Sequence, residues 1–329
     1  MSAPYTVVIA DFLEDADVET PILAEIADIV VARATNEASL VQFMPGADAL
    51  LLFHDIERIG EATFQAGPRC RGVVRAGVGY NNVDLAAADR AGVTVCNVPD
   101  YGTEEVADHA IMFLLAMTRR LIPCHEAIRE GTWHYDTALG TPRLRGKTFG
   151  VIGCGRIGTA TALRAKAFGL EVVFYDPHLP QGVDKALGIR RVQRLDDLLF
   201  QSDFVSLHCY LDATTRHLIN AESIARMRPG VYLINTARGP VVEEKALLDA
   251  LDSGQISGAA LDVLEHEPLA DERLRGHPKI LFTPHSAFYS VEGFVELRSK
   301  AAAEVRRILV GETPWNRVNN PGSRRVVAR

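Results

Sequence analysis

Polar side chains follow three apolar stretches late in the chain, and their types suit the reduction of a carbonyl group. Arg238 follows the first stretch, Glu265 and Glu267 follow the second, and His285 ends the third. A histidine can donate a proton near neutral pH, and a neighbouring carboxylate would hold its ring and fix its tautomer. An arginine can bind a substrate carboxylate through two parallel hydrogen bonds. If the stretches are strands of one parallel sheet, these groups meet at its carboxyl edge.

Each of these residues also has a simpler interpretation when it is taken alone. Arg238 could be a surface residue at a strand end, His285 a structural histidine, and the two glutamates solvated side chains. Their arrival at successive strand ends, after a nucleotide-binding motif, favours the chemical interpretation.

That motif is Gly153-x-Gly155-x-x-Gly158, which directly follows an apolar stretch and opens a helical pattern. The first glycine permits a tight turn, the second lets backbone approach a pyrophosphate, and the third lets helix and strand pack closely. The next predicted strand ends at Asp176, where a carboxylate would bind both ribose hydroxyls and repel a 2′-phosphate, so NAD is favoured over NADP. The alternative is a glycine-rich turn that serves packing only.

The elements that would position these residues alternate between short apolar stretches and amphipathic segments, which is the pattern of a parallel sheet. We expect an α/β fold with two doubly wound parallel sheets. The expected strands lie at residues 6–12, 28–34, 47–53, 71–77 and 93–99, and then at 148–153, 170–176, 203–209, 231–237, 256–263 and 280–285. One long helix is expected over residues 103–121 and another over 291–311.

This pattern predicts two domains. Residues 1–101 and 288–329 would form one domain, and residues 102–287 would form a second that is inserted before the C-terminal helix. The two crossings between them would act as a hinge.

Composition narrows the class of protein. The chain has 329 residues and a net charge of −7, which argues against non-specific nucleic-acid binding. Its five cysteines are scattered, and no signal peptide or apolar run of membrane-spanning length is visible, so we expect a cytoplasmic protein. No metal site is expected, because His208 and Cys209 have no further partner at ligand spacing.

Several motifs together resemble the D-isomer-specific 2-hydroxyacid dehydrogenases over nearly the whole chain. They are "RAGVGYNNVDL", "NVPDYGTEEVADHAI", "VIGCGRIG", "NTARG", "ALDVLEHEP" and "TPHSA". Within the family, "LRGKTFGVIG" and "TPHSAFYS" look closest to the C-terminal-binding proteins, which are NAD(H)-dependent corepressors that keep the dehydrogenase fold. The resemblance implies a flavodoxin-like substrate domain and an inserted Rossmann NAD-binding domain.

The resemblance also assigns residues. It places the catalytic groups at Arg238, Glu267 and His285, and it leaves Glu265 as a solvated bystander. The substrate-binding residues it implies are Arg75, Val78, Gly79 and Phe288. The cofactor-binding residues predicted from motif and resemblance together are Val106, Gly153, Gly155, Arg156, Ile157, Gly158, Asp176, Cys209, Thr236, Ala237 and Asp262. Asp262 would bind the nicotinamide carboxamide, or it could simply cap a strand end.

The function implied is NAD-dependent interconversion of a small 2-oxo acid, such as glyoxylate, hydroxypyruvate or pyruvate, with its D-2-hydroxy acid. Phe288 stands where the corepressors carry a tryptophan, which argues against their bulky oxo acid. The alternative function is an NAD(H)-sensing module that binds protein partners. Family likeness further predicts a homodimer formed through the NAD-binding domain, with the helix at 103–121 and the arm through Trp133 at the interface.

Overall fold

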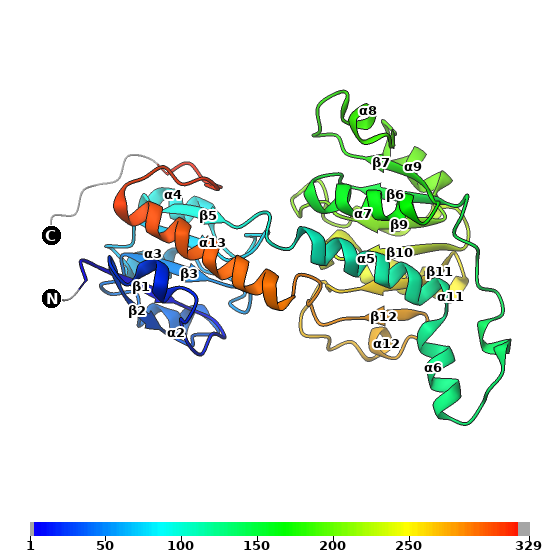
Figure 1. The fold of residues 1–329 in the computed structure, drawn as a ribbon, viewed down its shortest axis with the longest axis horizontal. Helices are drawn as coiled ribbons and strands as arrows, with labels where there is room; N and C mark the ends of the chain where they lie inside the picture. Colours follow the sequence, from blue (N-terminus) through cyan, green and yellow to red (C-terminus); the bar gives the residue numbers. More distant parts are fainter. Residues whose placement is uncertain (1–2, 322–329) are drawn as a thin grey trace. The chain divides into compact units, whose positions relative to one another are not determined.

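The computed structural model describes residues 3–321, and the chain divides into two compact units. Unit 1 comprises residues 1–102 and 290–329, and unit 2 comprises residues 103–289 (Figure 1). Residues 1–2 and 322–329 of the predicted first domain lie outside the described part of the chain. Both units are built on parallel sheets, so the predicted α/β fold is confirmed. The assignment of substrate and cofactor roles to the two units stays a prediction.

Unit 1 contains a five-stranded parallel sheet in the order β2-β1-β3-β4-β5. Its strands are β1 (Tyr5–Ile9), β2 (Ala27–Val31), β3 (Ala49–Leu52), β4 (Gly72–Arg75) and β5 (Thr94–Asn97). Its helices are α1 (Thr20–Leu23), α2 (Glu37–Val41), α3 (Glu61–Ala66), α4 (Leu85–Ala91) and α13 (Val291–Val310). Helix α13 comes from the far end of the chain and packs on β3 and β4, so the C-terminal segment completes the unit.

Unit 2 contains a seven-stranded parallel sheet in the order β12-β11-β10-β9-β6-β7-β8. Its strands are β6 (Thr148–Ile152), β7 (Glu171–Tyr175), β8 (Arg190–Arg191), β9 (Phe204–Leu207), β10 (Val231–Asn235), β11 (Ile256–Leu261) and β12 (Ile280–Phe282). Its helices are α5 (Thr103–Thr118), α6 (Leu121–Arg129), η1 (Tyr135–Ala138), α7 (Arg156–Ala167), α8 (Val183–Leu187), α9 (Leu195–Gln201), α10 (Ala221–Ala225), η2 (Gly239–Val241), α11 (Glu244–Ser253) and α12 (Glu272–Arg275). The strand order reverses between β6 and β9, and such a reversal is where open parallel sheets bind ligands.

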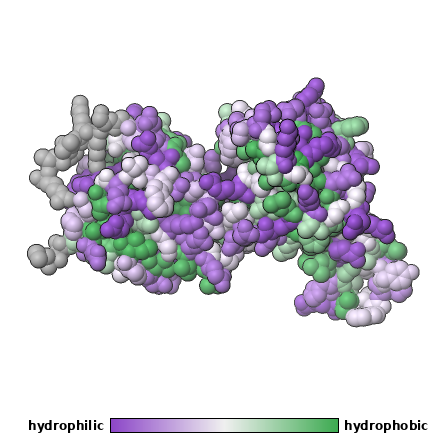
Figure 2. Space-filling view, turned by 45° about the horizontal axis from the view of Figure 1, so that its top comes forward, coloured by the Kyte–Doolittle hydropathy of each residue, from purple (hydrophilic) through white to green (hydrophobic). Residues whose placement is uncertain are grey.

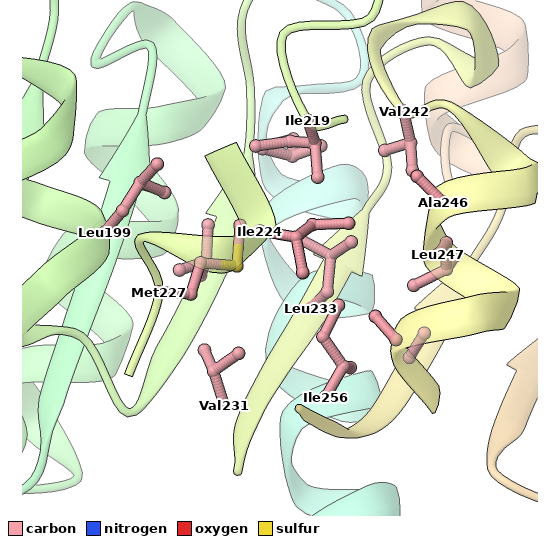
Figure 3. Packing of buried hydrophobic residues seen from close by; sticks show 14 of the residues in the cluster. Leu199, Ile219, Ile224, Met227, Val231, Leu233, Val242, Ala246, Leu247 and Ile256 are labelled. Atoms are coloured by element: carbon pink, nitrogen blue, oxygen red, sulfur yellow. The ribbon is translucent and has the colours of Figure 1, made fainter. Parts of the chain in front are cut away.

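The core of unit 2 consists of apolar side chains on both faces of its sheet. One cluster joins α5 and α7 to the strands, and the other joins α9, α10 and α11 to the opposite face. Figure 3 shows part of the second cluster, in which Ile224, Leu233, Leu247 and Ile256 pack against one another from two strands and two helices. Strands covered on both faces are expected to be almost continuously apolar, as the central strands β6, β9, β10 and β11 are. The core thereby holds the strand ends in fixed positions.

Two predicted elements differ from the structure, and one strand was not predicted. The long helix ends at Thr118, and a separate helix α6 begins at Leu121, because Arg120 between them adopts a left-handed conformation with φ 51°. The last strand ends at Phe282, so His285 lies in the loop that follows it. Strand β8 is only two residues long, and the sequence pattern did not reveal it.

The surface of unit 2 exposes large hydrophobic side chains around α6. Figure 2 shows hydrophobic residues reaching the visible surface at the lower right, where Figure 1 places this helix. The most exposed ones on α6 and the segment after it are Leu121, Ile128, Trp133, Tyr135 and Leu139. Within residues 3–321, no helix is both long enough and apolar enough to cross a membrane.

Candidate active site

The glycine motif forms a tight turn between β6 and α7 at the point where the strand order reverses. Gly153 has φ 86°, and a Cβ there would lie 2.6 Å from the backbone nitrogen of Cys209. A Cβ at Gly158 would lie 2.0 Å from the Gly153 carbonyl oxygen. A Cβ at Gly155 would meet nothing within 4 Å, so this position opens onto free space at the start of α7. The first and third glycines are therefore required by packing, whereas the second leaves room for a ligand.

This turn fits the phosphates of a dinucleotide. Gly155 is the N-cap of α7 and provides no side-chain cap, so the first N–H groups of the helix point toward the open side. Arg156 and Ile157 form the first turn of the helix, and their contact with the cofactor stays a prediction.

Asp176 lies beside the glycine turn, directly after β7. Its Oδ2 accepts a hydrogen bond from the Cys154 N–H at 2.9 Å, and its Oδ1 accepts one from the His178 N–H at 2.9 Å. The half-buried carboxylate is thereby held at the carboxyl edge of the sheet, next to the motif. Its contact with a ribose stays a prediction.

Other predicted cofactor residues lie at neighbouring strand ends. Cys209 follows β9 and its backbone packs under Gly153, while burial raises the pKa of its thiol to about 12. Thr236 follows β10, is 8% exposed, and its Oγ1 has no hydrogen-bond partner among the described residues. A buried hydroxyl without a partner is costly in the free protein, which supports a ligand at this strand end. Ala237 comes next, and Val106 lies buried in the first turns of α5.

The structure brings Glu267 and His285 together. His285 follows β12 with φ 52°, and its N–H donates to the Asp262 carbonyl at 2.8 Å. Its Nδ1 lies 2.8 Å from Glu267 Oε2, while Glu267 Oε1 accepts the Leu264 N–H at 3.0 Å. The carboxylate thus holds one ring nitrogen of the histidine and directs the other away from itself.

Arg238 follows β10 and its charge acts on the same carboxylate. The Asn235 side chain donates to the Arg238 carbonyl at 2.9 Å, and the arginine Nη1 donates to the Ala237 carbonyl at 2.7 Å. Partial burial raises the pKa of Glu267. The hydrogen bond and charge of His285 and the charge of Arg238 lower the pKa by more than burial raises it, so the net pKa lies below the ordinary value. Glu267 is therefore ionised at neutral pH.

Asp262 organises the loop that carries His285. Its Oδ1 accepts bonds from the Thr283 hydroxyl at 2.6 Å and the Ser286 N–H at 2.9 Å, and its Oδ2 accepts the Ala287 N–H at 3.0 Å. The strand-end cap anticipated as an alternative is therefore present. A carboxylate has about four acceptor positions, so these three bonds leave room for a carboxamide.

Two histidines that sequence reasoning missed support these loops. His109 on α5 lies 2.9 Å from the Thr283 hydroxyl through its Nε2, and burial lowers its pKa despite the opposing charge of Asp262. His217 lies 2.5 Å from Glu265 through its Nε2. The expectation that Glu265 is a solvated bystander is wrong, because its side chain is only 19% exposed and binds other segments of unit 2. Local spacing gives no signal for these long-range pairs.

In unit 1, the predicted substrate loop follows β4. Arg75 is 9% exposed, and its guanidinium covers Gly77, where a Cβ would lie 1.6 Å from Nη1. The Val78 carbonyl accepts the Asn97 side-chain amide at 2.7 Å, while the Val78 side chain is 37% exposed. The loop that also carries Gly79 is thus held firmly at the carboxyl edge of its own sheet.

The remaining predicted substrate residue, Phe288, belongs to unit 2. Its ring meets the His285 ring edge-on, with centroids 6.5 Å apart. Within the described part of the chain, no cluster of three or more histidine, cysteine, aspartate or glutamate side chains could hold a metal ion.

Comparison with known proteins agrees with this geometry. The family described as "D-isomer specific 2-hydroxyacid dehydrogenase, NAD binding domain" matches residues 111–287, which is more than half of the chain. The matched residues span the dinucleotide-binding part of unit 2. The chain belongs to the D-isomer specific 2-hydroxyacid dehydrogenase family, whose members depend on NAD or NADP.

Two curated relatives are similar over most of this chain. A D-3-phosphoglycerate dehydrogenase from Synechocystis sp. is 35% identical over 316 residues, which cover 96% of this chain and 56% of the relative. C-terminal-binding protein 1 from Caenorhabditis elegans is 36% identical over 310 residues, which cover 91% of this chain and 42% of the relative. The chain spans about half the length of these relatives, and their near-equal identities do not resolve the branch within the family.

Two solved structures are similar over almost their whole length. The D-lactate dehydrogenase from Aquifex aeolicus, complexed with NAD and lactic acid, has a TM-score of 0.86 and 29% identity, covering 96% of this chain and 100% of that one. An NADPH-dependent glyoxylate/hydroxypyruvate reductase from Sinorhizobium meliloti, in complex with NADP and malonate, has a TM-score of 0.86 and 29% identity, covering 99% and 100%. The two use different dinucleotides within one fold.

Proposed function

We propose that this protein reduces a small 2-oxo acid to the D-2-hydroxy acid with NADH and catalyses the reverse reaction with NAD. The observation that carries the proposal is the His285–Glu267 pair at 2.8 Å, with the charge of Arg238 acting on the same carboxylate. These groups lie on the same edge of the sheet as the glycine turn. The bound nicotinamide would supply or accept the hydride.

The chain's own residues would manage the charge and the proton. Arg238 would bind the substrate carboxylate and polarise the ketone. His285 would protonate the forming alkoxide oxygen through Nε2, because Glu267 holds Nδ1. In the reverse direction neutral His285 would take that proton. Glu267 would remain ionised throughout and stabilise the charged imidazole.

Residues of unit 1, together with Phe288, would provide substrate contacts. We propose that the backbone amides of Val78 and Gly79 hold the substrate carboxylate, and that Arg75 contacts the substrate. Phe288 would form a pocket wall, as its contact with the His285 ring supports. Small substrates such as glyoxylate, hydroxypyruvate or pyruvate are favoured.

We propose NAD as the preferred cofactor. The Asp176 carboxylate is fixed beside the glycine turn, where it would bind the ribose hydroxyls and repel a 2′-phosphate. The nearby Arg191 donates to the carbonyl oxygens of Asp176, Leu179 and Pro180, so its guanidinium already serves the loop after β7. Gly153, Gly158, Cys209, Thr236 and Asp262 would complete the cofactor site.

A homodimer through unit 2 is proposed from its exposed apolar surface. Trp133 is 85% exposed and Tyr135 is 72% exposed, and both lie on the segment that follows α6. Burial of such side chains against a second copy would remove them from water. Trp133→Glu should shift the mass measured by light scattering toward the monomer, and an unchanged mass would contradict this interface. A cytoplasmic location is proposed because all five cysteines are free thiols.

The test of the main function is NADH oxidation over a panel of 2-oxo acids, with NADPH in parallel. Rapid turnover of a small 2-oxo acid supports the dehydrogenase. The 36% identity to a C-terminal-binding protein supports a second candidate, an NAD(H)-sensing module that binds protein partners. Tight NADH binding without turnover of any oxo acid would favour that module.

A further inference from the structure

A second histidine–carboxylate pair includes Glu265, which lies two residues before Glu267 in the sequence. His217 Nε2 lies 2.5 Å from Glu265 Oε1. Glu265 Oε2 accepts the Glu244 N–H at 3.0 Å, and the Glu265 N–H donates to Glu244 Oε1 at 2.7 Å. These bonds join the segment after β9, the start of α11 and the loop after β11. We call this cluster of His217, Glu244 and Glu265 the brace.

The brace fixes the loop that carries Glu267. In this loop the Leu264 N–H donates to Glu267 Oε1 at 3.0 Å, so a shift of the loop would move the catalytic carboxylate. The loop also touches the residue that follows Arg238, because a Cβ at Gly239 would lie only 1.7 Å from the Leu264 carbonyl oxygen. Arg238 and Glu267 are therefore carried by two segments in direct contact.

The other end of the brace is anchored in the core of unit 2. The His217 N–H donates to the Pro240 carbonyl at 2.8 Å, and the Ile219 N–H donates to the Val241 carbonyl at 3.0 Å. Figure 3 shows Ile219, Val242 and Ala246 in the apolar cluster on this face of the sheet. Because cores are close-packed, segments anchored in this way have little freedom to move.

Charge at the brace comes from several elements. The ionised or polar groups that face Glu244 are Glu265, His266 and Asp271, and partial burial is the main cause that raises the pKa of Glu244. His217 supplies the imidazole that faces Glu265. Removing the Glu265 carboxylate would leave the Glu244 N–H without its acceptor and His217 without its carboxylate.

We propose that Glu265, held by His217 and the start of α11, is a positioning residue that orients Glu267 and, through it, His285. Glu265 itself touches neither the predicted substrate nor the predicted cofactor residues in the contacts described above. The proposal rests on the dehydrogenase function proposed above. Loss of the brace should impair proton transfer and leave cofactor binding intact. The glycine turn and Asp176 follow other strands, and Asp262 is held by its own bonds to Thr283, Ser286 and Ala287.

The experiment compares Glu265→Ala, Glu265→Gln and a matched control, Glu222→Ala, whose side chain is 77% exposed and pairs with Arg226 on the same unit. Glu265→Ala should lower kcat roughly tenfold, as is usual for outer partners of a site, and should shift the pH profile of kcat. KM and the NADH dissociation constant should stay within about twofold of the parent. Glu265→Gln should recover most of the activity, because its amide oxygen still accepts the Glu244 N–H.

Two outcomes would overturn the proposal. One is a Glu265→Ala pH profile that superimposes on the parent profile at unchanged kcat. The other is a loss of activity fully explained by a smaller folded fraction, with kcat per folded molecule unchanged. If Glu265→Ala does not fold, His217→Asn removes the same histidine–carboxylate contact and is judged by the same criteria.

A measurement that needs no turnover distinguishes failure of the proposed dehydrogenase function from failure of the positioning role of Glu265. The imidazole of His285 can be titrated by NMR in the parent and in each variant, with His285→Asn identifying the signal. A changed titration in Glu265→Ala, but not in Glu222→Ala, supports positioning even if no 2-oxo acid is reduced. An unchanged titration overturns it.

Discussion

The two edges of the seven-stranded sheet in unit 2 carry the same types of side chain but differ in what these can do. At the amino edge, Asp203 accepts the Thr148 N–H at 2.9 Å and pairs with Lys147 and Arg228 at 3.2 Å each. His277, just before β12, pairs with Asp252 at 3.3 Å. These groups are paired with one another and hold the beginnings of strands.

At the carboxyl edge, an arginine and a histidine follow β10 and β12 and share one glutamate. The hydrogen bond and charge of His285 and the charge of Arg238 both lower the pKa of Glu267, so one carboxylate interacts with both side chains. A histidine–carboxylate pair is thus not a site by itself. The two edges differ because the arginine, the glutamate and the histidine lie at the same edge as the open glycine turn. All strands of the sheet run in the same direction, so only the carboxyl edge carries this combination.

The largest expected effect comes from removing one histidine at each end of β12. His285→Ala should lower turnover by about 10²- to 10⁴-fold, the usual contribution of a general acid. His277→Ala should leave turnover within about twofold, since its ring pairs with Asp252 at the other edge. Steady-state kinetics with NADH and the best 2-oxo acid would measure both. Equal effects of the two substitutions would contradict the functional difference between the edges.

The sequence predicts features whose residues are close together along the chain, and it does not predict contacts between residues that are far apart. The glycine turn, Asp176 and the residues at strand ends follow from local patterns, because a strand and the residue after it are adjacent in sequence. The partners of these residues do not. His109 meets Thr283 across 174 positions, and no local spacing encodes that contact.

The break between α5 and α6 was missed for a different reason. Arg120 takes a left-handed conformation without a glycine to signal it. Pro123 was the available signal, since it lies in the first turn of α6, where a missing N–H costs little.

The second prediction concerns His208, which lies at the carboxyl edge after β9 but is not assigned to the chemistry. Burial lowers its pKa to about 3 from an ordinary 6.5. Between these pH values the unfolded chain binds a proton at residue 208 that the folded chain does not bind. The stabilisation that comes from neutral His208 is therefore fully present above about pH 6.5. The free energy of unfolding then decreases as the pH falls toward 3.

This pH dependence can be isolated by comparing two proteins. Between pH 7 and pH 4 the parent should lose roughly 3 kcal/mol more unfolding free energy than His208→Gln. Glutamine cannot titrate, yet it can still bind the Ser206 hydroxyl, which lies 2.8 Å from the His208 Nε2. Urea denaturation at each pH would give the values. Parallel pH curves for the two proteins would show that His208 is not the buried neutral group described.

The third prediction compares the two arginines at opposite ends of β10. Arg238→Ala should raise KM for the oxo acid and reduce kcat, lowering kcat/KM by roughly 30-fold, because a charged hydrogen bond contributes about 2 kcal/mol. Arg228→Ala removes only a half-exposed ion pair with Asp203 and should change kcat/KM by less than about twofold. If Arg238→Ala alters neither parameter, Arg238 is a surface residue at a strand end.

The smallest expected effect concerns the choice of cofactor, and two aspartates test it. Asp176→Ala should shift the ratio of kcat/KM for NADH over NADPH toward NADPH by roughly tenfold, because repulsion of a 2′-phosphate is lost. Asp203→Ala should lower stability without moving this ratio. Because Asp176 also accepts the Cys154 and His178 N–H groups, Asp176→Asn is the decisive variant. The asparagine removes the charge and keeps one acceptor. If the NADH-to-NADPH ratio shifts in both variants, the preference comes from the charge of Asp176. If the ratio shifts only in Asp176→Ala, the preference comes from the conformation of the loop that Asp176 holds.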